Sequence, residues 1–263
     1  MATKKSAAKP SYGFGWVPDL PDQRDVLYSA PLTIVKKLPA KVDLRAKCPP
    51  VYDQGQLGSC TANALAGAFE FEQMKQKKKA FMPSRLFIYY NERVILNTVN
   101  SDSGAVIRDG IKTLNKQGVC PEKEWTYDDD NSAGAKFTKK PPAQCYTDAL
   151  KNQITSYQRL INTNLFQLQS CLSEGYPFVF GFTVYQSFMN IGKDGMMPMP
   201  KSTESVLGGH AVMAVGYDSA KQVFIVRNSW NTTWAVKGYF YMPFAYITDA
   251  HKADDFWTIR MVE

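Results

Sequence analysis

The sequence of 263 residues predicts an α+β fold, with a helical lobe followed by a β-sheet lobe. Apolar residues recur at helical spacing before about residue 150, and turn-separated runs of β-branched and aromatic residues follow. Helices first and strands second is the order typical of such chains. A cleft between two lobes is a common place for an active site.

The first half contains three predicted helices. One runs from Ser59 to about Lys77 with Ser59 as a candidate N-cap, and the next begins at Pro83 and Ser84. The third passes through "AVIRDGIKTLNKQG" and stops at Gly118.

The second half contains one short predicted helix, from Leu165 to Leu172, and five predicted strands. The strands are runs of β-branched and aromatic residues bounded by turn residues. They cover Phe178 to Val184, Ala211 to Tyr217, Gln222 to Val226, Gly238 to Met242 and Phe256 to Met261.

Residues 1–37 differ from the rest of the chain. They contain "GFGWVPDLPDQRD", rich in Gly, Pro and Asp, which indicates an extended arm or a short pro-like segment. The main domain is predicted over 38–263, with a helical lobe at about 45–150, a β lobe at about 151–255 and a C-terminal strand at 256–263.

Charge and hydropathy narrow the function classes. The net charge of +7 has the sign that nucleic-acid binding requires, but no basic motif with interleaved aromatic residues is present. We interpret "KQKKK" as a solvated helix end, and we expect a monomer that does not bind nucleic acid. No apolar run approaches the roughly 18 residues that span a bilayer, and no secretory signal is visible. We therefore expect an intracellular protein without membrane association.

The chain has five cysteines, an odd number that leaves at least one thiol free. No two of them form a CxxC pair, so their spacing predicts neither a zinc cluster nor a dithiol motif. We expect no metal and no cofactor. The cysteines are Cys48, Cys60, Cys120, Cys145 and Cys171.

Cys60 stands in "DQGQLGSCTANAL", between a glycine-punctuated stretch and a predicted helix. It is either a small buried thiol or a nucleophile. A thiol attacks as the thiolate, and a helix N-terminus or a paired histidine favours that form. The helix start is supplied by the sequence itself.

Only two histidines are available to pair with the thiol. His210 lies in "GGHAVMAVGYD" at the start of a predicted strand, whereas His251 lies in a polar loop and is expected at the surface. Asn228, in "RNSWNTTW", can accept a hydrogen bond from an imidazole and orient it, and Trp230 and Trp234 could exclude water from that bond. Cys60, His210 and Asn228, each considered alone, are more often structural than catalytic.

Taken together, the blocks "DQGQLGSC", "GGHAVMAVGYD" and "RNSW…W…KGYF" resemble those of papain-like cysteine peptidases, the cathepsins. His210 follows Cys60 by 150 residues and Asn228 follows it by 168, near the spacing of that family. The resemblance begins at about Leu38 and implies a two-lobe fold with a helical left lobe and an antiparallel β-sheet or barrel as right lobe. The "GGH" sequence resembles the corresponding sequence of the cathepsin B branch.

The resemblance implies a cysteine-type endopeptidase that acts on polypeptides through a thioester. Cys60 would be the nucleophile, His210 its ion-pair partner and general acid, and Asn228 the residue that orients His210. Gln54 would donate its side-chain amide to the oxyanion, together with the backbone N–H of Cys60. The implied substrate-binding residues are Gly58, Ser103, Gly104, Gly209 and Trp230.

The sequence also departs from the family pattern. Leu57 replaces a cysteine that forms a disulfide in the family, and Thr61 replaces an aromatic residue. Asn231 and Ala235 replace glycines. No catalytic group is lost by these changes.

Two points stay open at this stage. The arm over 1–37 either lies in the cleft and inhibits the enzyme until it is cut near Lys37 or Leu38, or packs permanently on the lobes; an aromatic residue in "GFGWVPDLP" could fill a subsite. Asp254 or Asp255 is either near the floor of the S2 pocket or a solvated loop acid.

Alternative functions are a catalytically silent scaffold and a non-proteolytic acyl transferase.

Overall fold

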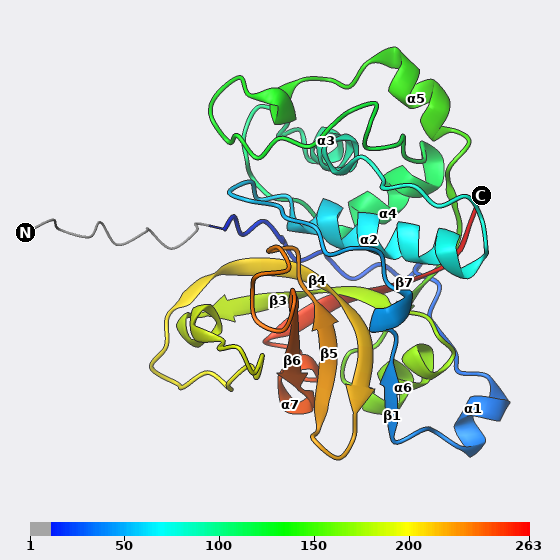
Figure 1. Ribbon diagram of the computed structural model, residues 1–263, viewed down its shortest axis with the longest axis vertical. Coiled ribbons are helices and arrows are strands. Elements are labelled where there is room, and N and C mark those ends of the chain that lie inside the picture. Colours follow the sequence, from blue (N-terminus) through cyan, green and yellow to red (C-terminus); the bar gives the residue numbers. More distant parts are fainter. Residues whose placement is uncertain (1–11) are drawn as a thin grey trace, which may run out of the picture.

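The computed structural model describes residues 12–263, and within this range the molecule has two lobes (Figure 1). Helices form one lobe and a twisted sheet forms the other, as the sequence predicts. Residues 1–11 of the predicted arm lie outside the described range. Within that range no helix combines the length and the apolar character needed to cross a bilayer.

The helical lobe is built around α2 (Cys60–Lys75), which is buried over most of its surface. The next helix, α3, is capped by the Ser84 hydroxyl, which accepts a hydrogen bond from the backbone N–H of Phe87 at 3.2 Å. Ser59 is the N-cap residue of α2, as the sequence predicts, but its side chain makes no capping hydrogen bond and its hydroxyl contacts Tyr127 Oη instead. The other helical segments here are α3 (Arg85–Leu96), α4 (Ile107–Lys116), the 3₁₀ turn Lys136–Thr138 and α5 (Ala143–Ala149).

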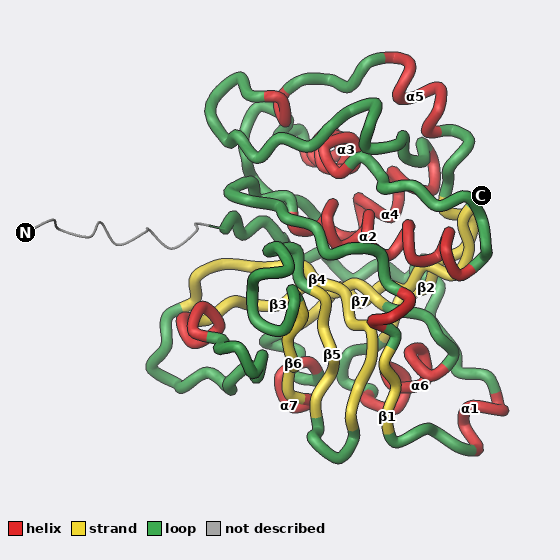
Figure 2. The backbone as a smooth tube through the Cα atoms, viewed as in Figure 1, coloured by secondary structure: helices red, strands yellow, loops and turns green. Residues whose placement is uncertain are grey.

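The second lobe is one antiparallel sheet in the order β2-β7-β3-β4-β5-β6, with β1 paired to the far part of β4. The sheet is open rather than a closed barrel, because β2 and β6 form its ends. Figure 2 shows the strands below the helical lobe. The strands are β1 (Lys41–Asp43), β2 (Ile154–Leu160), β3 (Phe178–Tyr185), β4 (Val206–Asp218), β5 (Val223–Arg227), β6 (Tyr239–Pro243) and β7 (Ala253–Val262).

Four short helical segments cover the sheet and its edges. The largest is α6 (Leu165–Ser173), which packs against β4. The others are the 3₁₀ turn Arg45–Lys47, the 3₁₀ turn Gln186–Asn190 and α7 (Phe244–Ile247).

The segment from residue 12 to α1 (Leu32–Lys36) runs between the two lobes before it reaches the outer edge of the sheet lobe (Figure 1). Trp16 forms an isolated bridge with Ala105 of the helical lobe, and Leu27 forms one with Arg159 of β2. The arm is therefore part of the folded protein over the described residues.

Phenylalanine rings fill the core beneath the sheet. Phe178 is fully buried, and its ring centroid lies 5.6 to 6.1 Å from those of Phe180, Phe224 and Phe256. Such clusters contribute through burial of large apolar area.

We expect Phe178→Ala to lower the free energy of unfolding by about 3–5 kcal/mol, because it leaves a cavity among these rings. The matched control is Phe166→Ala, on the surface of α6 with 40% of its side chain exposed. The control should change stability by less than about 1 kcal/mol. Denaturant unfolding of both variants measures the difference, and equal effects would contradict the assigned core.

Candidate active site

Cys60 is the first residue of α2 and is fully buried. The loop before it is held from the helical lobe, where the Asp102 carboxylate accepts the backbone N–H of Gly58 at 2.9 Å. Tyr89 donates its hydroxyl to the same carboxylate at 2.5 Å. The helix start and its preceding loop therefore have a fixed position.

His210 lies in β4, and its Nε2 is 2.8 Å from the Asn228 Oδ1 atom that follows β5. The antiparallel pairing of β4 with β5 brings these two residues together. The ring of Trp230 lies over the imidazole, with 5.0 Å between ring centroids, and is completely buried. Among the described residues, His210 Nδ1 has no hydrogen-bond partner, so this nitrogen is available for another group.

Gln54 has a side-chain amide with a defined orientation. Its Oε1 accepts a hydrogen bond from the Ser229 hydroxyl at 2.6 Å, which fixes Nε2 as the end that donates. Nε2 donates to the carbonyl of Leu57 and to the carbonyl of Gly13 in the arm, both at 3.0 Å. The side-chain amide of Gln54 therefore directs an N–H toward the arm, at the Gly13 carbonyl.

The arm passes through the site and forms backbone hydrogen bonds on both sides. The Trp16 N–H donates to the Gly209 carbonyl at 3.0 Å, and the Ala105 N–H donates to the Gly15 carbonyl at 2.7 Å. Val17 donates in turn to the Ala105 carbonyl at 2.9 Å. The arm thus bonds with backbone groups of both lobes.

Aromatic residues of the arm cover the site. Tyr12 stacks on Trp230 with centroids 4.4 Å apart, and Phe14 meets the His210 ring edge-on at 6.1 Å. Glycines permit the close approach of the backbones: a Cβ on Gly15 would lie 1.7 Å from the Gly58 carbonyl oxygen. Any larger residue at position 15 would collide with the loop before Cys60.

Trp16 fills a pocket in the sheet lobe. Its ring lies against Gly181 of β3, and its Nε1 donates to Asp255 Oδ2 at 2.8 Å. Asp255 is fully buried and has a φ of 60°, a left-handed conformation near the start of β7. The pairing of β3 with β7 shifts register between Trp257 and Asp254, so the left-handed conformation of Asp255 belongs to a β-bulge. Of the two acids considered from the sequence, Asp255 lies in the pocket and Asp254 is half exposed.

Ion pairs fix the chain that follows Trp16. Asp19 pairs with Arg108 of α4 at 3.3 Å and with Arg159 of β2 at 3.0 Å, and both arginines also pair with Asp25. Arg159 reaches Asp255 as well, at 3.4 Å. Burial, and next the neighbouring Asp19, raise the pKa of the Asp255 carboxyl.

Burial also sets the charge of the two central groups. It raises the pKa of the Cys60 thiol to about 12 and lowers the pKa of the His210 imidazole to about 4. The backbone N–H groups of Ala211 and Gly15 lower the pKa of Cys60 by a smaller amount, and the bond to Asn228 raises that of His210. With the arm in place, both groups are therefore held neutral.

The structure brings most of the predicted site residues together. Gly58, Gly209 and Trp230 each contact the arm, and a Cβ on Gly104 would collide with the carbonyl of Gly15. Ser103 makes no hydrogen bond with the described part of the arm, since its hydroxyl donates to Thr98 Oγ1. His251 is exposed, as the sequence predicts.

Sequence reasoning missed three positioning residues. Ala105 forms the backbone bonds expected one or two residues earlier, Asp102 holds the loop at Gly58, and Ser229 orients Gln54. Asp102 and Ala105 flank the predicted "SG" pair, and Ser229 follows Asn228. Each of the three lies next to a residue that the sequence already assigns to the site, and this adjacency is the signal that could have identified it.

A family model described as papain family cysteine protease matches residues 38–250. The chain belongs to this family. It is a papain-like cysteine protease, a hydrolase, and proteases of this family act on polypeptides.

Similar sequences occur in distant organisms. The chain is 44% identical to an uncharacterized peptidase C1-like protein, L477, of Acanthamoeba polyphaga mimivirus, over 96% of this chain and 88% of the relative. It is 25% identical to cysteine proteinase 3 of Entamoeba histolytica, over 78% of this chain and 63% of the relative.

Solved structures agree with the fold. Xylellain, a cysteine protease from Xylella fastidiosa, superposes with a TM-score of 0.89 at 47% identity, covering 98% of this chain and all of that one. Procathepsin B S9 of Trypanosoma congolense has a TM-score of 0.72 at 17% identity over 88% of this chain and 80% of its own, which supports the fold alone. The predicted papain-like two-lobe α+β fold is confirmed.

The raised pKa of Asp255 predicts how arm docking depends on pH. Asp255 binds its proton more tightly when the arm is docked, so docking takes up a proton between its ordinary and its raised pKa. Docking is therefore strongest at low pH and weakens as pH rises through the raised pKa. Other charged groups at this point are Asp19 on the arm, Arg159 of β2, Arg108 of α4 and Asp254 of β7.

Hydrogen exchange at the Trp16 and Val17 amides, corrected for intrinsic rates, measures docking. We expect protection to fall from about pH 5 to about pH 9. Asp255→Asn, which keeps the shape and stays neutral, should flatten this dependence, and Asp249→Asn, remote from the arm, should not. A pH profile that is the same in Asp255→Asn and the parent protein would contradict the assignment.

Proposed function

We propose that the protein is an endopeptidase that uses Cys60 as nucleophile, and that the N-terminal arm holds it in a latent state. The observation that carries the proposal is the imidazole of His210, whose Nε2 is held by Asn228 while the buried Nδ1 has no partner among the described residues. A base oriented on one nitrogen and unoccupied on the other is the arrangement that nucleophilic catalysis needs.

The proximity of the thiol supports the same role. The backbone N–H of Ala211, the residue after His210, acts on the Cys60 sulfur. The start of α2 adds the positive end of a helix dipole, which stabilises a thiolate once water and substrate replace the arm.

The proposed reaction has two steps. The Cys60 thiolate attacks the peptide carbonyl carbon, the oxyanion is stabilised by Gln54 Nε2 and the backbone N–H of Cys60, and His210 protonates the leaving amine. Water then attacks the thioester with His210 as base, which releases the acid and restores the thiol. The Gly13 carbonyl, which accepts from Gln54 Nε2, stands in for the substrate carbonyl.

Latency is proposed from the same contacts. The arm occupies the backbone partners at Gly209 and Ala105, and Trp16 fills the pocket that ends at Asp255. Its cover desolvates Cys60 and His210, which favours the neutral pair over the thiolate–imidazolium pair. Self-inhibition by residues 12–37 follows, and cleavage or displacement of the arm would relieve it.

Gly15→Ala tests latency without removing the arm, because its Cβ would collide with the Gly58 carbonyl. We expect the rate of Cys60 alkylation by an epoxide inhibitor, and of peptide cleavage, to rise about tenfold or more as the uncovered fraction grows. Gly192→Ala is the control, since the nearest atom to its Cβ is an Asp194 side-chain oxygen at 3.4 Å. Unchanged rates in Gly15→Ala and in protein cut near Lys37 would make the arm a permanent part of the active enzyme.

Gln54→Ala tests the oxyanion role. In protein released from the arm, kcat/KM for peptides should fall about 10²–10³-fold because a transition-state donor is lost. Gln56→Ala, an exposed residue of the same loop, should have little effect. Cys60 should still be labelled in Gln54→Ala, whereas Cys60→Ser should lose labelling and cleavage together. Cleavage by Cys60→Ser at the parent rate would refute the nucleophile.

A further inference from the structure

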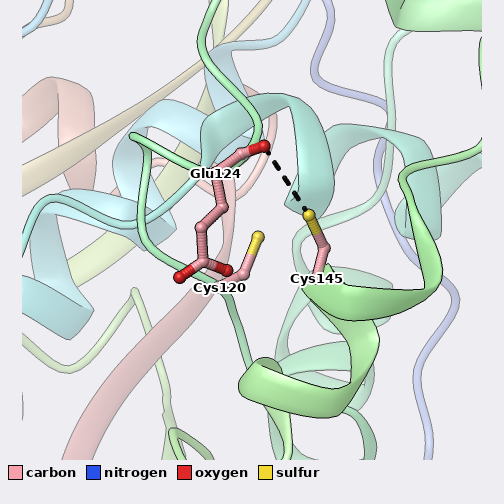
Figure 3. A group of neighbouring side chains, drawn as sticks. All are labelled: Cys120, Glu124 and Cys145. Atoms are coloured by element: carbon pink, nitrogen blue, oxygen red, sulfur yellow. Dashed lines mark hydrogen bonds between the residues drawn. The ribbon is translucent and has the colours of Figure 1, made fainter.

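A second group of reactive side chains lies in the helical lobe, outside the active site. Figure 3 shows Cys120 and Glu124, from the segment after α4, facing Cys145 of α5. One ligand atom from each, two sulfurs and a carboxylate oxygen, lie within 4.8 Å of one another. Both cysteines are buried and neither is in a disulfide.

We propose that Cys120, Glu124 and Cys145 bind one thiophilic divalent metal ion of the zinc class. Two thiolates and one carboxylate match the ligands of tetrahedral Zn²⁺, which sets sulfurs about 3.8 Å apart. Side-chain movements of about 1 Å or less bring the three atoms to that spacing. Sulfur ligands exclude Mg²⁺ and Ca²⁺, which take oxygen ligands.

Unsatisfied groups at the cluster support the proposal. Among the described residues, Glu124 Oε2 is buried without a hydrogen-bond partner. The Cys145 thiol donates to the backbone carbonyl of Glu124 over a long distance of 3.9 Å. Buried polar atoms without partners need a reason, and a bound cation between them supplies one.

The charges of the three side chains are also compatible with a bound divalent cation. Each thiol must lose its proton to bind a metal ion as the thiolate. Binding of M²⁺ forms two sulfur–metal bonds and releases two protons to solvent. Two thiolates, one carboxylate and the ion carry a net charge of about −1. Lys123 and Lys151 act electrostatically on Glu124 in the direction that offsets that charge, whereas Asp148 acts in the opposite direction.

An ion here would tie α5 to the segment that supports the active site. The Cys120 carbonyl accepts from Ser84 N at 2.9 Å, and Glu122 pairs with Arg85 at 3.0 Å. Tyr127, at the end of the segment, donates to the Gln54 carbonyl at 2.9 Å. The inference does not depend on the proposed endopeptidase activity, since it concerns a different part of the lobe.

Cobalt titration tests the site in the full-length, reduced Cys60→Ser protein, which lacks the other thiol that could bind a metal beside His210. We expect one Co²⁺ per chain, with thiolate-to-cobalt charge transfer and tetrahedral d–d bands, release of about two protons, and displacement by Zn²⁺. Cys120→Ser and Cys145→Ser should each abolish the charge-transfer band, or halve it and lower the affinity for Co²⁺ about tenfold or more. Glu124→Gln should lower the affinity for Co²⁺ about tenfold or more. Cys171→Ser, a buried cysteine outside the cluster, is the matched control and should bind normally.

X-ray absorption on the zinc-loaded protein requires no variant at the cluster. Two sulfur neighbours at about 2.3 Å with oxygen or nitrogen at about 2.0–2.2 Å are expected. No sulfur neighbour, or cobalt bands that persist unchanged in both cysteine variants, would overturn the proposal. A Cys120–Cys145 disulfide in the isolated protein together with no metal binding after reduction would overturn it as well.

Discussion

The close packing of α2 on the sheet lobe is the constraint on which the rest of the structure depends. Gly67 of α2 faces the Arg227 side chain at the end of β5, and a Cβ there would lie 2.7 Å from Arg227 Nη1. Arg227 also donates to the Pro50 carbonyl at 2.5 Å and lies 4.5 Å from the Tyr52 ring centroid. This contact sets the start of α2, and hence Cys60, against the strand that carries His210.

The arm lies between the two lobes that this packing holds together (Figure 1). It pairs with backbone on both sides, which is independent of side-chain sequence, and it gains selectivity from Trp16 and the ion pairs of Asp19. In the proposed latent state, the arm occupies the site and its cover removes water from Cys60 and His210, and burial favours the neutral form of each group. The proposal therefore links docking to charge, since displacement of the arm would expose both Cys60 and His210 to water.

The sequence was most informative where chemistry is carried by short contiguous blocks. Cys60, Gln54, His210 and Asn228 were each predicted as site residues because their neighbours form recognisable motifs. It was least informative where a partner is distant: Asp255 could not be separated from a solvated acid without Trp16, which lies 239 residues earlier. The short α5 and the edge strand β2, with its half-exposed polar residues, lacked the periodicity that reveals longer or buried elements. Closure into a barrel also could not be decided from strand runs, since it depends on whether β2 and β6 meet.

The loop before Cys60 illustrates how a lost covalent bond can be replaced. Leu57 stands where the family pattern has a disulfide-forming cysteine, and it is completely buried. Hydrogen bonds hold the loop in its place: Asp102 binds the Gly58 N–H, Gln54 binds the Leu57 carbonyl, and Tyr127 binds the Gln54 carbonyl. Each such bond contributes only about 1 kcal/mol, more for those to a charged group, so several are needed to match one disulfide. Because none of them involves sulfur, these hydrogen bonds do not depend on the redox state of the surroundings.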